Sequence, residues 1–257
     1  MEDHNEEESG KYASQYLTHF VGKEKDAETA FRILCKVIKD RRLLPGGSEE
    51  NWAGNLSVSP NSPFSGNRLF NPGMVCFCDI PLTKMLRIHT QKYSCFGLAF
   101  DKEWAAQHRG ASPVFYLAEG SCLTDHRYPD GHPHRGTTRK EFFNLAAHDW
   151  LTDLASRGGI RAVAYLSRAD NMLLWYVLSY CKFFDETLDG SHENNYYMER
   201  EWRTIGQVKF EPSDIARVVL PRGFEERFKD EFRSDPCSSC LVDKIHLLDL
   251  DDGNPCG

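Results

Sequence analysis

The stretch YYMEREWR, residues 196–203, places two carboxylates two positions apart in an aromatic-rich segment. In an extended strand, this spacing puts Glu199 and Glu201 on one face, about 7 Å apart, with Arg203 beside them. Trp202 points the other way, so the carboxylates are not expected in the core. Two anionic groups next to a guanidinium can bind a sugar hydroxyl or stabilise a developing cation. The alternative is an edge strand whose charged face is solvated.

Length and composition indicate a globular protein. The 257 residues suffice for one large domain with a sizeable core, and no apolar run is long enough to cross a bilayer. Residues 1–11 are acidic and lack the hydrophobic segment of a secretory signal, so we expect a disordered lead-in to a single domain over 12–257. These features predict a cytoplasmic protein without a membrane partner.

The charge balance restricts the possible ligands. A formal net charge of −7, without long basic runs, disfavours a broad nucleic-acid surface. A local basic patch could still serve a small phosphate-bearing ligand. No phosphate-cradling glycine pattern, nucleophile elbow or His-Glu-x-x-His helix is present, so hydrolase and nucleotide-kinase functions lack their usual sequence support.

Nine cysteines, mostly in apolar segments, indicate free thiols in a reducing compartment rather than a disulfide framework. The thiols expected to be small core residues are those of Cys35, Cys76, Cys95 and Cys181. One set near the C-terminus could bind zinc, namely Cys237, Cys240, His246 and Cys256. A second candidate metal group is the histidines of the loop 125–138, namely His126, His132 and His134. Neither set has the complete spacing of a structural zinc site, so no metal is expected.

Hydrophobic periodicity predicts short strands interspersed with helices, and hence the α+β class. Strands are expected at 16–20, 74–80, 96–100, 113–118, 162–166, 196–210 and 215–220, and helices at 26–42, 81–89, 102–109, 140–157, 170–184 and 224–232. Long loops are expected near 46–73 and 125–138, a length typical of functional lids or of disorder.

His19 ends the first expected strand, next to the first helix. A lone histidine in such a place is most simply a structural residue. A polar ring at a strand end, near a helix start, also suits hydrogen bonding to a ligand, so both interpretations stay open.

The order of these segments resembles the AbiGi family of bacterial abortive phage-resistance proteins, which carries an antitoxin description. The most specific parts are CFCDIP at 76–81, FGLAFDKEW at 96–104 and EREWR at 199–203. The resemblance implies a role in phage defence, with a toxin, an antitoxin or a phage protein as partner.

A more distant resemblance is to mono-ADP-ribosyltransferases, which carry a histidine on the first strand, an aromatic residue on a later strand and a glutamate on a late strand. It implies mixed sheets of short strands flanked by helices, and NAD as the substrate. His19 would contact the nicotinamide-side ribose, Glu201 would be the catalytic carboxylate, and Glu199 would be the first glutamate of a Glu-x-Glu pattern. The remaining NAD-binding residues would be Arg203 and a nicotinamide-stacking ring, for which Phe77, Tyr93 and Phe96 are alternatives. The middle strand lacks a Ser-Thr-Ser triplet, which leaves the acceptor undefined.

Two functions follow from these resemblances. The first is a phage-defence enzyme with an ADP-ribosyltransferase-like site that transfers ADP-ribose or cleaves NAD. The alternative is a non-enzymatic antitoxin, or a binding protein that senses phage, whose acidic surface suits a basic partner. A metal-dependent nuclease built on the histidine loop has the least support, because the net charge is negative and paired acidic and histidine motifs are missing.

Overall fold

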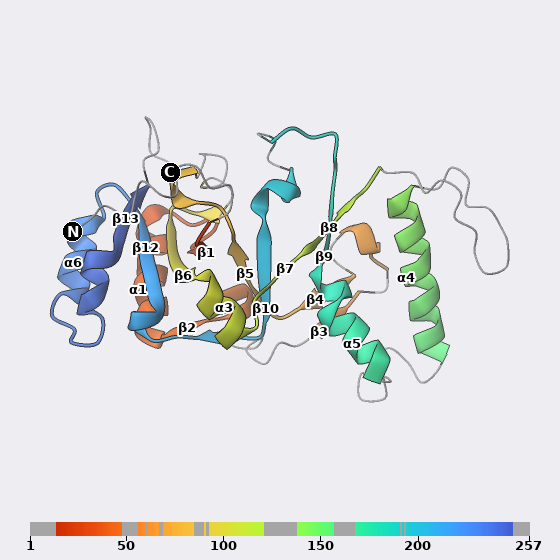
Figure 1. Cartoon of the computed structure of the whole chain (residues 1–257), viewed down its shortest axis with the longest axis horizontal. Coiled ribbons are helices and arrows are strands. Elements are labelled where there is room, and N and C mark those ends of the chain that lie inside the picture. Colours follow the sequence, from red (N-terminus) through yellow and green to blue (C-terminus); the bar gives the residue numbers. More distant parts are fainter. Residues whose placement is uncertain are drawn as a thin grey trace. The chain divides into compact units, whose positions relative to one another are not determined.

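The computed structural model describes residues 14–47, 56–59, 61–66, 69–84, 90, 93–120, 138–156, 168–190, 192 and 194–248, and the architecture concerns these residues. The chain forms two compact units (Figure 1). Unit 1 comprises Met1–Gly54, Met74–Ser112 and Glu199–Gly257, and unit 2 comprises Asn55–Gly73 and Pro113–Met198. The predicted α+β class is confirmed, because helices accompany a mixed sheet.

Unit 1 is built on a sheet with the strand order β13-β12-β6-β1-β5-β10-β7. Its strands are β1 (Tyr16–Val21), β5 (Met74–Cys78), β6 (Phe96–Asp101), β7 (Ser112–Pro113), β10 (Glu201–Ile205), β12 (Ile215–Pro221) and β13 (Ile245–Leu248). β12 and β13 pair in parallel, whereas β12 with β6, β6 with β1, β1 with β5 and β5 with β10 are antiparallel. In the sheet, β1 therefore lies between β6 and β5, two strands that are distant from it in the sequence.

The pairing of β1 is uneven on its two sides. β1 and β6 share six register positions, and β5 and β10 share five. β1 and β5 pair at one position, Thr18 with Cys78, the last residue of β5. The ladder between these two strands is therefore shorter than the ladders beside it in the sheet.

The helix α1 (Ala27–Asp40) follows β1 and confirms the prediction for this segment. Asp26 caps it by accepting a 2.9 Å hydrogen bond from the backbone N–H of Thr29. The apolar stripe expected from the sequence is buried in the core of unit 1, and the ring of Phe31 contacts that of Phe96 on β6. This packing fixes the helix on the sheet.

Further elements complete unit 1. They are β2 (Arg42–Leu43), η1 (Pro45–Gly47), η4 (Leu82–Lys84), α3 (Lys102–Arg109), β11 (Val208–Lys209), η8 (Pro212–Asp214), α6 (Glu225–Phe232) and η9 (Ser239–Lys244). β2 and β11 form a separate antiparallel pair. α3 occupies the predicted range 102–109; the Asp101 side chain caps its start, and Gly110 follows its last residue in a left-handed conformation.

Unit 2 has its own small core around Phe64, Leu151 and Phe183. Its elements are β3 (Leu56–Val58), η3 (Phe64–Gly66), β4 (Phe70–Pro72), β8 (Phe115–Ala118), α4 (Arg139–Ser156), α5 (Arg168–Tyr176), η6 (Leu178–Tyr180) and β9 (Cys181–Phe184). The short helix η7 (Tyr196–Glu199) spans the boundary, because Met198 ends unit 2 and Glu199 resumes unit 1. β3 pairs with β4 antiparallel, and β8 pairs with β9 in parallel.

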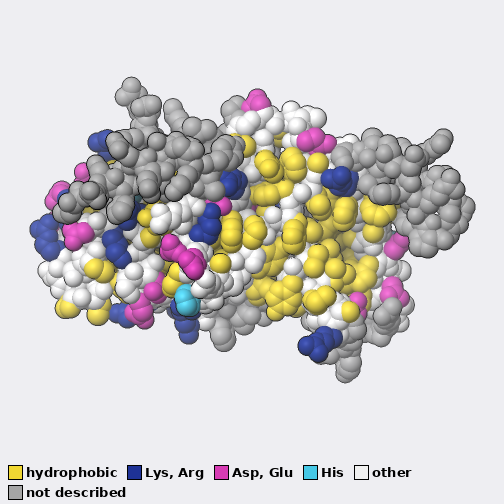
Figure 2. Space-filling model, in the orientation of Figure 1, with side chains coloured by type: hydrophobic (Ala, Val, Ile, Leu, Met, Phe, Trp, Pro, Cys, Tyr) yellow, Lys and Arg dark blue, Asp and Glu magenta, His cyan; other side chains and the backbone are white. Residues whose placement is uncertain are grey.

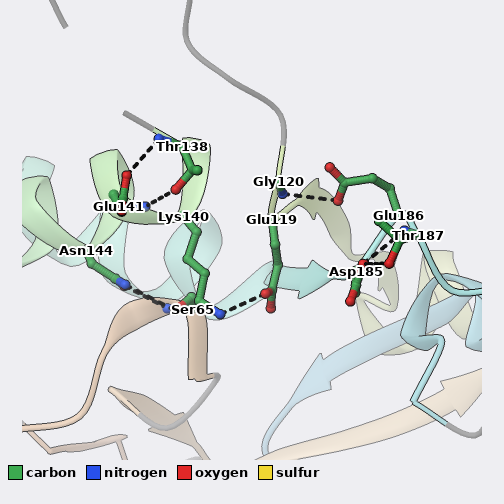
Figure 3. Close-up of polar contacts among 10 residues, drawn as sticks. All are labelled: Ser65, Glu119, Gly120, Thr138, Lys140, Glu141, Asn144, Asp185, Glu186 and Thr187. Carbon is green, nitrogen blue, oxygen red and sulfur yellow. Dashed lines mark hydrogen bonds and ion pairs between the residues drawn. The ribbon is translucent and has the colours of Figure 1, made fainter. Parts of the chain in front are cut away.

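Polar contacts at the N-terminal end of α4 tie it to its neighbours (Figure 3). Asn144 on α4 bonds both the backbone and the hydroxyl of Ser65, and the Lys140 ammonium lies 2.8 Å from the Glu119 carboxylate. The backbone N–H of Gly120 donates to Glu186, which follows β9. These bonds connect α4 to η3 and to the end of β8, and the end of β8 to the end of β9, within unit 2.

Several sequence predictions for the elements are corrected. The helix expected over 170–184 ends at Tyr176, because 181–184 is extended and buries Phe183 against the core of unit 2. β3 and β4 lie within the loop expected at 46–73, and β13 was not predicted. The lead-in 1–11, the strand expected at 162–166 and residues 125–137 of the second loop lie outside the described residues.

Two predictions for the cysteines also change. Cys95 is buried as expected but is disulfide-bonded, and Cys76 is exposed rather than a core residue. Cys35 is a buried free thiol, as predicted. In the described part of the chain, no helix has both the length and the apolar character needed to cross a membrane.

Gly22, between β1 and α1, gives a test of how closely the helix packs. Its φ is +76°, and an added Cβ would lie 2.4 Å from the Cβ of Ala30 on α1. Gly110, with φ +67°, has no atom within 4 Å of the same position among the described residues. We expect Gly110→Ala to lower the free energy of unfolding by about 1–2 kcal/mol through left-handed strain alone. Gly22→Ala should cost about 1–3 kcal/mol more, because helix and strand must separate. Urea unfolding of both variants measures the difference, and equal losses would contradict the close packing.

Candidate functional site

The segment 196–203 is not one strand. η7 ends at Glu199, Arg200 has φ +46°, and β10 begins at Glu201. A left-handed conformation is uncommon for a residue other than glycine, and such outliers cluster at functional sites. The spacing argument therefore holds for Glu201 and Arg203, which share a face of β10, but not for Glu199, which precedes the strand.

Both carboxylates are buried, which corrects the expectation of a solvated charged face. Glu199 and Glu201 are each 7% exposed. Arg203 holds Glu201 through two hydrogen bonds, from Nε at 2.7 Å and from Nη2 at 3.3 Å. A buried carboxylate is expensive unless it is paired, so the guanidinium is what makes burial of Glu201 tolerable. We call Glu199, Glu201, Arg203 and Tyr93 the carboxylate cluster.

Tyr93 belongs to this cluster through its electrostatics. Burial raises the pKa of its phenol well above the usual range, and the negative charges of Glu199 and Glu201 raise it further. The phenol therefore stays protonated and can donate a hydrogen bond at every physiological pH. Its ring stacks on Phe20 of β1, with centroids 6.0 Å apart and planes 13° apart.

A row of side chains crosses the sheet beside the cluster. Thr18, Cys78 and Glu201 are direct neighbours on β1, β5 and β10, so they point to the same face. The Thr18 hydroxyl is buried and has no hydrogen-bond partner among the residues that the structure describes. Burial raises the pKa of the Cys78 thiol, so this sulfur is a neutral thiol rather than a nucleophilic thiolate.

Sequence analysis missed Asp79, which organises the surroundings of the cluster. Asp79 is 5% exposed. Its carboxylate accepts a hydrogen bond from the backbone N–H of Ser14 at 3.0 Å, and the Lys102 ammonium donates to both carboxylate oxygens, at 2.8 and 2.9 Å. The Arg200 guanidinium lies 3.7 Å away, and the Asp79 N–H donates to the Arg200 carbonyl. In the sequence, Asp79 is a single aspartate at the end of an apolar strand. This pattern does not show that its partners Lys102 and Arg200 are 23 and 121 positions away.

His19 follows Thr18, the residue through which β1 pairs with β5. Its Nδ1 is 2.8 Å from the carbonyl oxygen of Cys76. A carbonyl accepts only, so Nδ1 carries the proton and Nε2 is the acceptor of the neutral ring. Burial lowers the pKa of His19, and the bond to Cys76 raises it in part. By strand alternation His19 points away from Thr18, and its ring meets the edge of Phe77 at 5.9 Å.

The aromatic candidates occupy different places. Phe77 is 2% exposed and packs on Phe100, and Phe96 is fully buried against Phe31 and Phe224. Tyr93 is the candidate that the structure places beside the carboxylates.

The metal candidates are not brought together within the described residues. Cys237 and Cys240 are exposed, Cys256 lies outside the described residues, and so do the histidines 126, 132 and 134. Over the described ranges, no group of three or more His, Cys, Asp or Glu side chains could hold a metal ion.

Comparison with known families gives one match. A family model described as "Putative abortive phage resistance protein AbiGi, antitoxin" matches residues 69–222, which is more than half of the chain. The match includes β5, β6 and β10 and hence Asp79, Tyr93 and all of the carboxylate cluster, while β1 with His19 lies before it. This confirms the family resemblance seen in the sequence. Searches of curated proteins and of solved structures found no match.

His19 predicts how stability depends on pH. Its pKa in the folded chain lies below 6.5, so the unfolded chain binds more protons once the pH falls below that value. Stability from the neutral ring is therefore present above pH 6.5 and is lost on acidification, by up to about 1.4 kcal/mol per pH unit. We expect His19→Gln to flatten the fall in unfolding free energy between pH 7 and 5, measured by urea unfolding. His108→Gln, an exposed histidine on α3, is the control and should keep the wild-type slope. An unchanged slope in His19→Gln would contradict the assignment.

Proposed function

The chain belongs to the AbiGi family of abortive phage resistance proteins, and on this premise we propose that it acts in abortive-infection defence and that its carboxylate cluster binds NAD. The proposed reaction cleaves the bond between nicotinamide and ribose and passes ADP-ribose to water or to another acceptor. One observation carries the proposal: two buried carboxylates converge on Tyr93 beside the row of Thr18, Cys78 and Glu201.

The cluster suits the charge that this reaction develops. The bond to nicotinamide breaks with its electron pair on the nicotinamide nitrogen, and positive charge builds on the ribose ring. The incoming hydroxyl forms the new bond to the same carbon and releases its proton. A carboxylate on the ribose 2′-hydroxyl interacts more strongly as the ring becomes cationic, which lowers the barrier.

Each residue has a distinct role in the proposal. Glu201 is the catalytic carboxylate, held in place by Arg203. Glu199 supplies a second negative charge, and Tyr93 offers an aromatic face to the nicotinamide. His19 points away from the face that carries Thr18 and Glu201, so the proposed contact of its Nε2 with a ribose hydroxyl requires the ligand to reach both faces of the sheet.

Turnover of NAD tests this function. We expect purified wild-type protein to release nicotinamide, and Glu201→Gln to reduce the rate by about 10²-fold or more, because a preorganised charge is lost. Glu103→Gln, which changes an exposed carboxylate on α3, is the matched control and should keep the wild-type rate. Chromatography of nicotinamide measures turnover, and circular dichroism shows whether each variant is folded.

The outcomes separate chemistry from binding. Full turnover by a folded Glu201→Gln protein would overturn the role of Glu201. Failure of the wild-type protein both to bind NAD in calorimetry and to release nicotinamide would overturn the NAD proposal as a whole.

A second candidate is an antitoxin that works by binding a toxin protein, as the family description suggests. The observation that favours it is the location of the exposed large hydrophobic side chains. Within the described residues all of them belong to unit 2: Phe115, Leu145, Met172, Tyr176, Val177 and Tyr197. Figure 2 shows hydrophobic side chains gathered over the part of the molecule that carries β8, β9 and α5. Apolar surface concentrated in this way marks a protein interface more often than a solvated face.

Charge placed on α5 tests this binding. Met172 and Tyr176 are 59% and 65% exposed and lie four positions apart on the helix, so they share a face. Co-expression of the wild-type chain with the toxin of the same defence system should restore growth. We expect Met172→Glu with Tyr176→Glu to abolish this rescue, because a desolvated carboxylate is costly in an apolar interface.

Ala169→Glu adds charge to an exposed position in the first turn of the same helix and is the control, which should still rescue growth. Rescue by the double variant at the wild-type level would exclude this surface. Growth inhibition by the wild-type chain expressed alone would favour the enzyme instead.

A further inference from the structure

A cavity of about 220 Å³ lies in unit 1, separate from the residues of the carboxylate cluster. The C-terminal end of α1, the β2–β11 pair and the last residue of α3 form its walls. Its lining residues are Asp40, Arg41, Arg42, Arg109, Lys209, Phe210 and Glu211. Four of these seven side chains are cationic and two are anionic.

Both carboxylates in the lining are already engaged. Asp40 forms an ion pair with Lys36 one turn earlier on α1. Glu211 lies 2.6 Å from the guanidinium of Arg41. The carboxylates of the lining are therefore held by Lys36 and Arg41, while Lys209 and Arg109 form no ion pair with a carboxylate of the described residues.

The strand register concentrates this charge. Arg42 on β2 and Lys209 on β11 are direct partners in the antiparallel pair, so both side chains leave the same face. Like charges directly opposite each other destabilise a strand pair. No ion pair joins Lys209 to a carboxylate of the described chain. Arg42 already has an interaction partner, so an anion bound here would chiefly offset the charge of Lys209.

Arg109 contributes an unsatisfied donor. Its Nε is removed from water and has no hydrogen-bond partner among the described residues, while Nη1 donates to the carbonyl of His108. The guanidinium lies over the ring of Trp104, 5.0 Å from the centroid, which restricts its plane. A buried donor without a partner among the described residues marks a position where a bound ligand can supply the acceptor.

We propose that this cavity binds a phosphate group, either inorganic phosphate or the phosphate monoester of a small ligand. Arginine guanidinium groups match phosphate oxygens with paired, charge-assisted bonds. The volume is below the roughly 300–1,000 Å³ of pockets that hold drug-sized ligands, so the cavity suits one anionic group. The C-termini of α1 and α3 add partial negative charge nearby, so binding of an anion relies on the side chains of Lys209 and Arg109. The proposal does not depend on NAD turnover.

Calorimetry at constant ionic strength tests the site with three probes: inorganic phosphate, adenosine monophosphate and adenosine. We expect phosphate and the monophosphate to bind and adenosine not to bind. Lys209→Gln and Arg109→Gln should each weaken binding by about tenfold or more, because each removes a charge-assisted contact. Lys23→Gln, an exposed lysine outside the cavity, is the control and should bind as the wild type does.

The pattern across the probes decides the proposal. Binding of phosphate alone would identify free phosphate as the ligand, and binding of both anions would identify the monoester group. The proposal is overturned if neither anion binds, if adenosine binds as well as its monophosphate, or if Lys209→Gln and Arg109→Gln both bind like the wild type. Lys209 is exposed, so its substitution tests the site even where Arg109→Gln perturbs folding.

Discussion

The buried carboxylate of Asp79 is the constraint on which the arrangement of unit 1 depends. Removing this charge from water is costly unless cations and N–H groups surround it. Ser14 before β1, Lys102 at the start of α3 and Arg200 before β10 supply those groups. Three segments that are distant in the sequence must therefore meet at the end of β5 before the charge is compensated, and this meeting sets where β10 begins.

The same constraint accounts for the shape of the carboxylate cluster. Arg200 is held in a left-handed conformation while its carbonyl accepts the Asp79 N–H and its guanidinium approaches the Asp79 carboxylate. That conformation ends η7 and takes Glu199 out of the strand, yet Glu199 and Glu201 both remain close enough to raise the pKa of Tyr93. The strain at Arg200 is thus offset by its contacts with Asp79, and its result is two carboxylates beside one phenol.

Local patterns predicted the elements whose signals are local. α1 follows from the cap Asp26 and its periodicity, α3 from a short segment that stops at Gly110, and β6 from a short apolar run. The patterns could not predict that 181–184 leaves the helical pattern, because its pairing with β8 and the burial of Phe183 are long-range. They paired Glu201 with Arg203 correctly but could not show that the pair is buried. Asp79 was missed for the same reason, since its partners come from three other parts of the chain.

The two units differ in which of their groups are energetically unfavourable: charged groups in unit 1 and exposed hydrophobic side chains in unit 2. Unit 1 buries carboxylates and gathers cations around a cavity, and both arrangements cost stability unless a ligand or a partner group compensates them. Unit 2 instead leaves large hydrophobic side chains in water, a cost that a protein partner would remove. The two proposals therefore concern different units, ligand binding in unit 1 and partner binding in unit 2. Because the residues involved do not overlap, an antitoxin role and an enzymatic role are compatible within one chain, and substitutions in one unit report on one role.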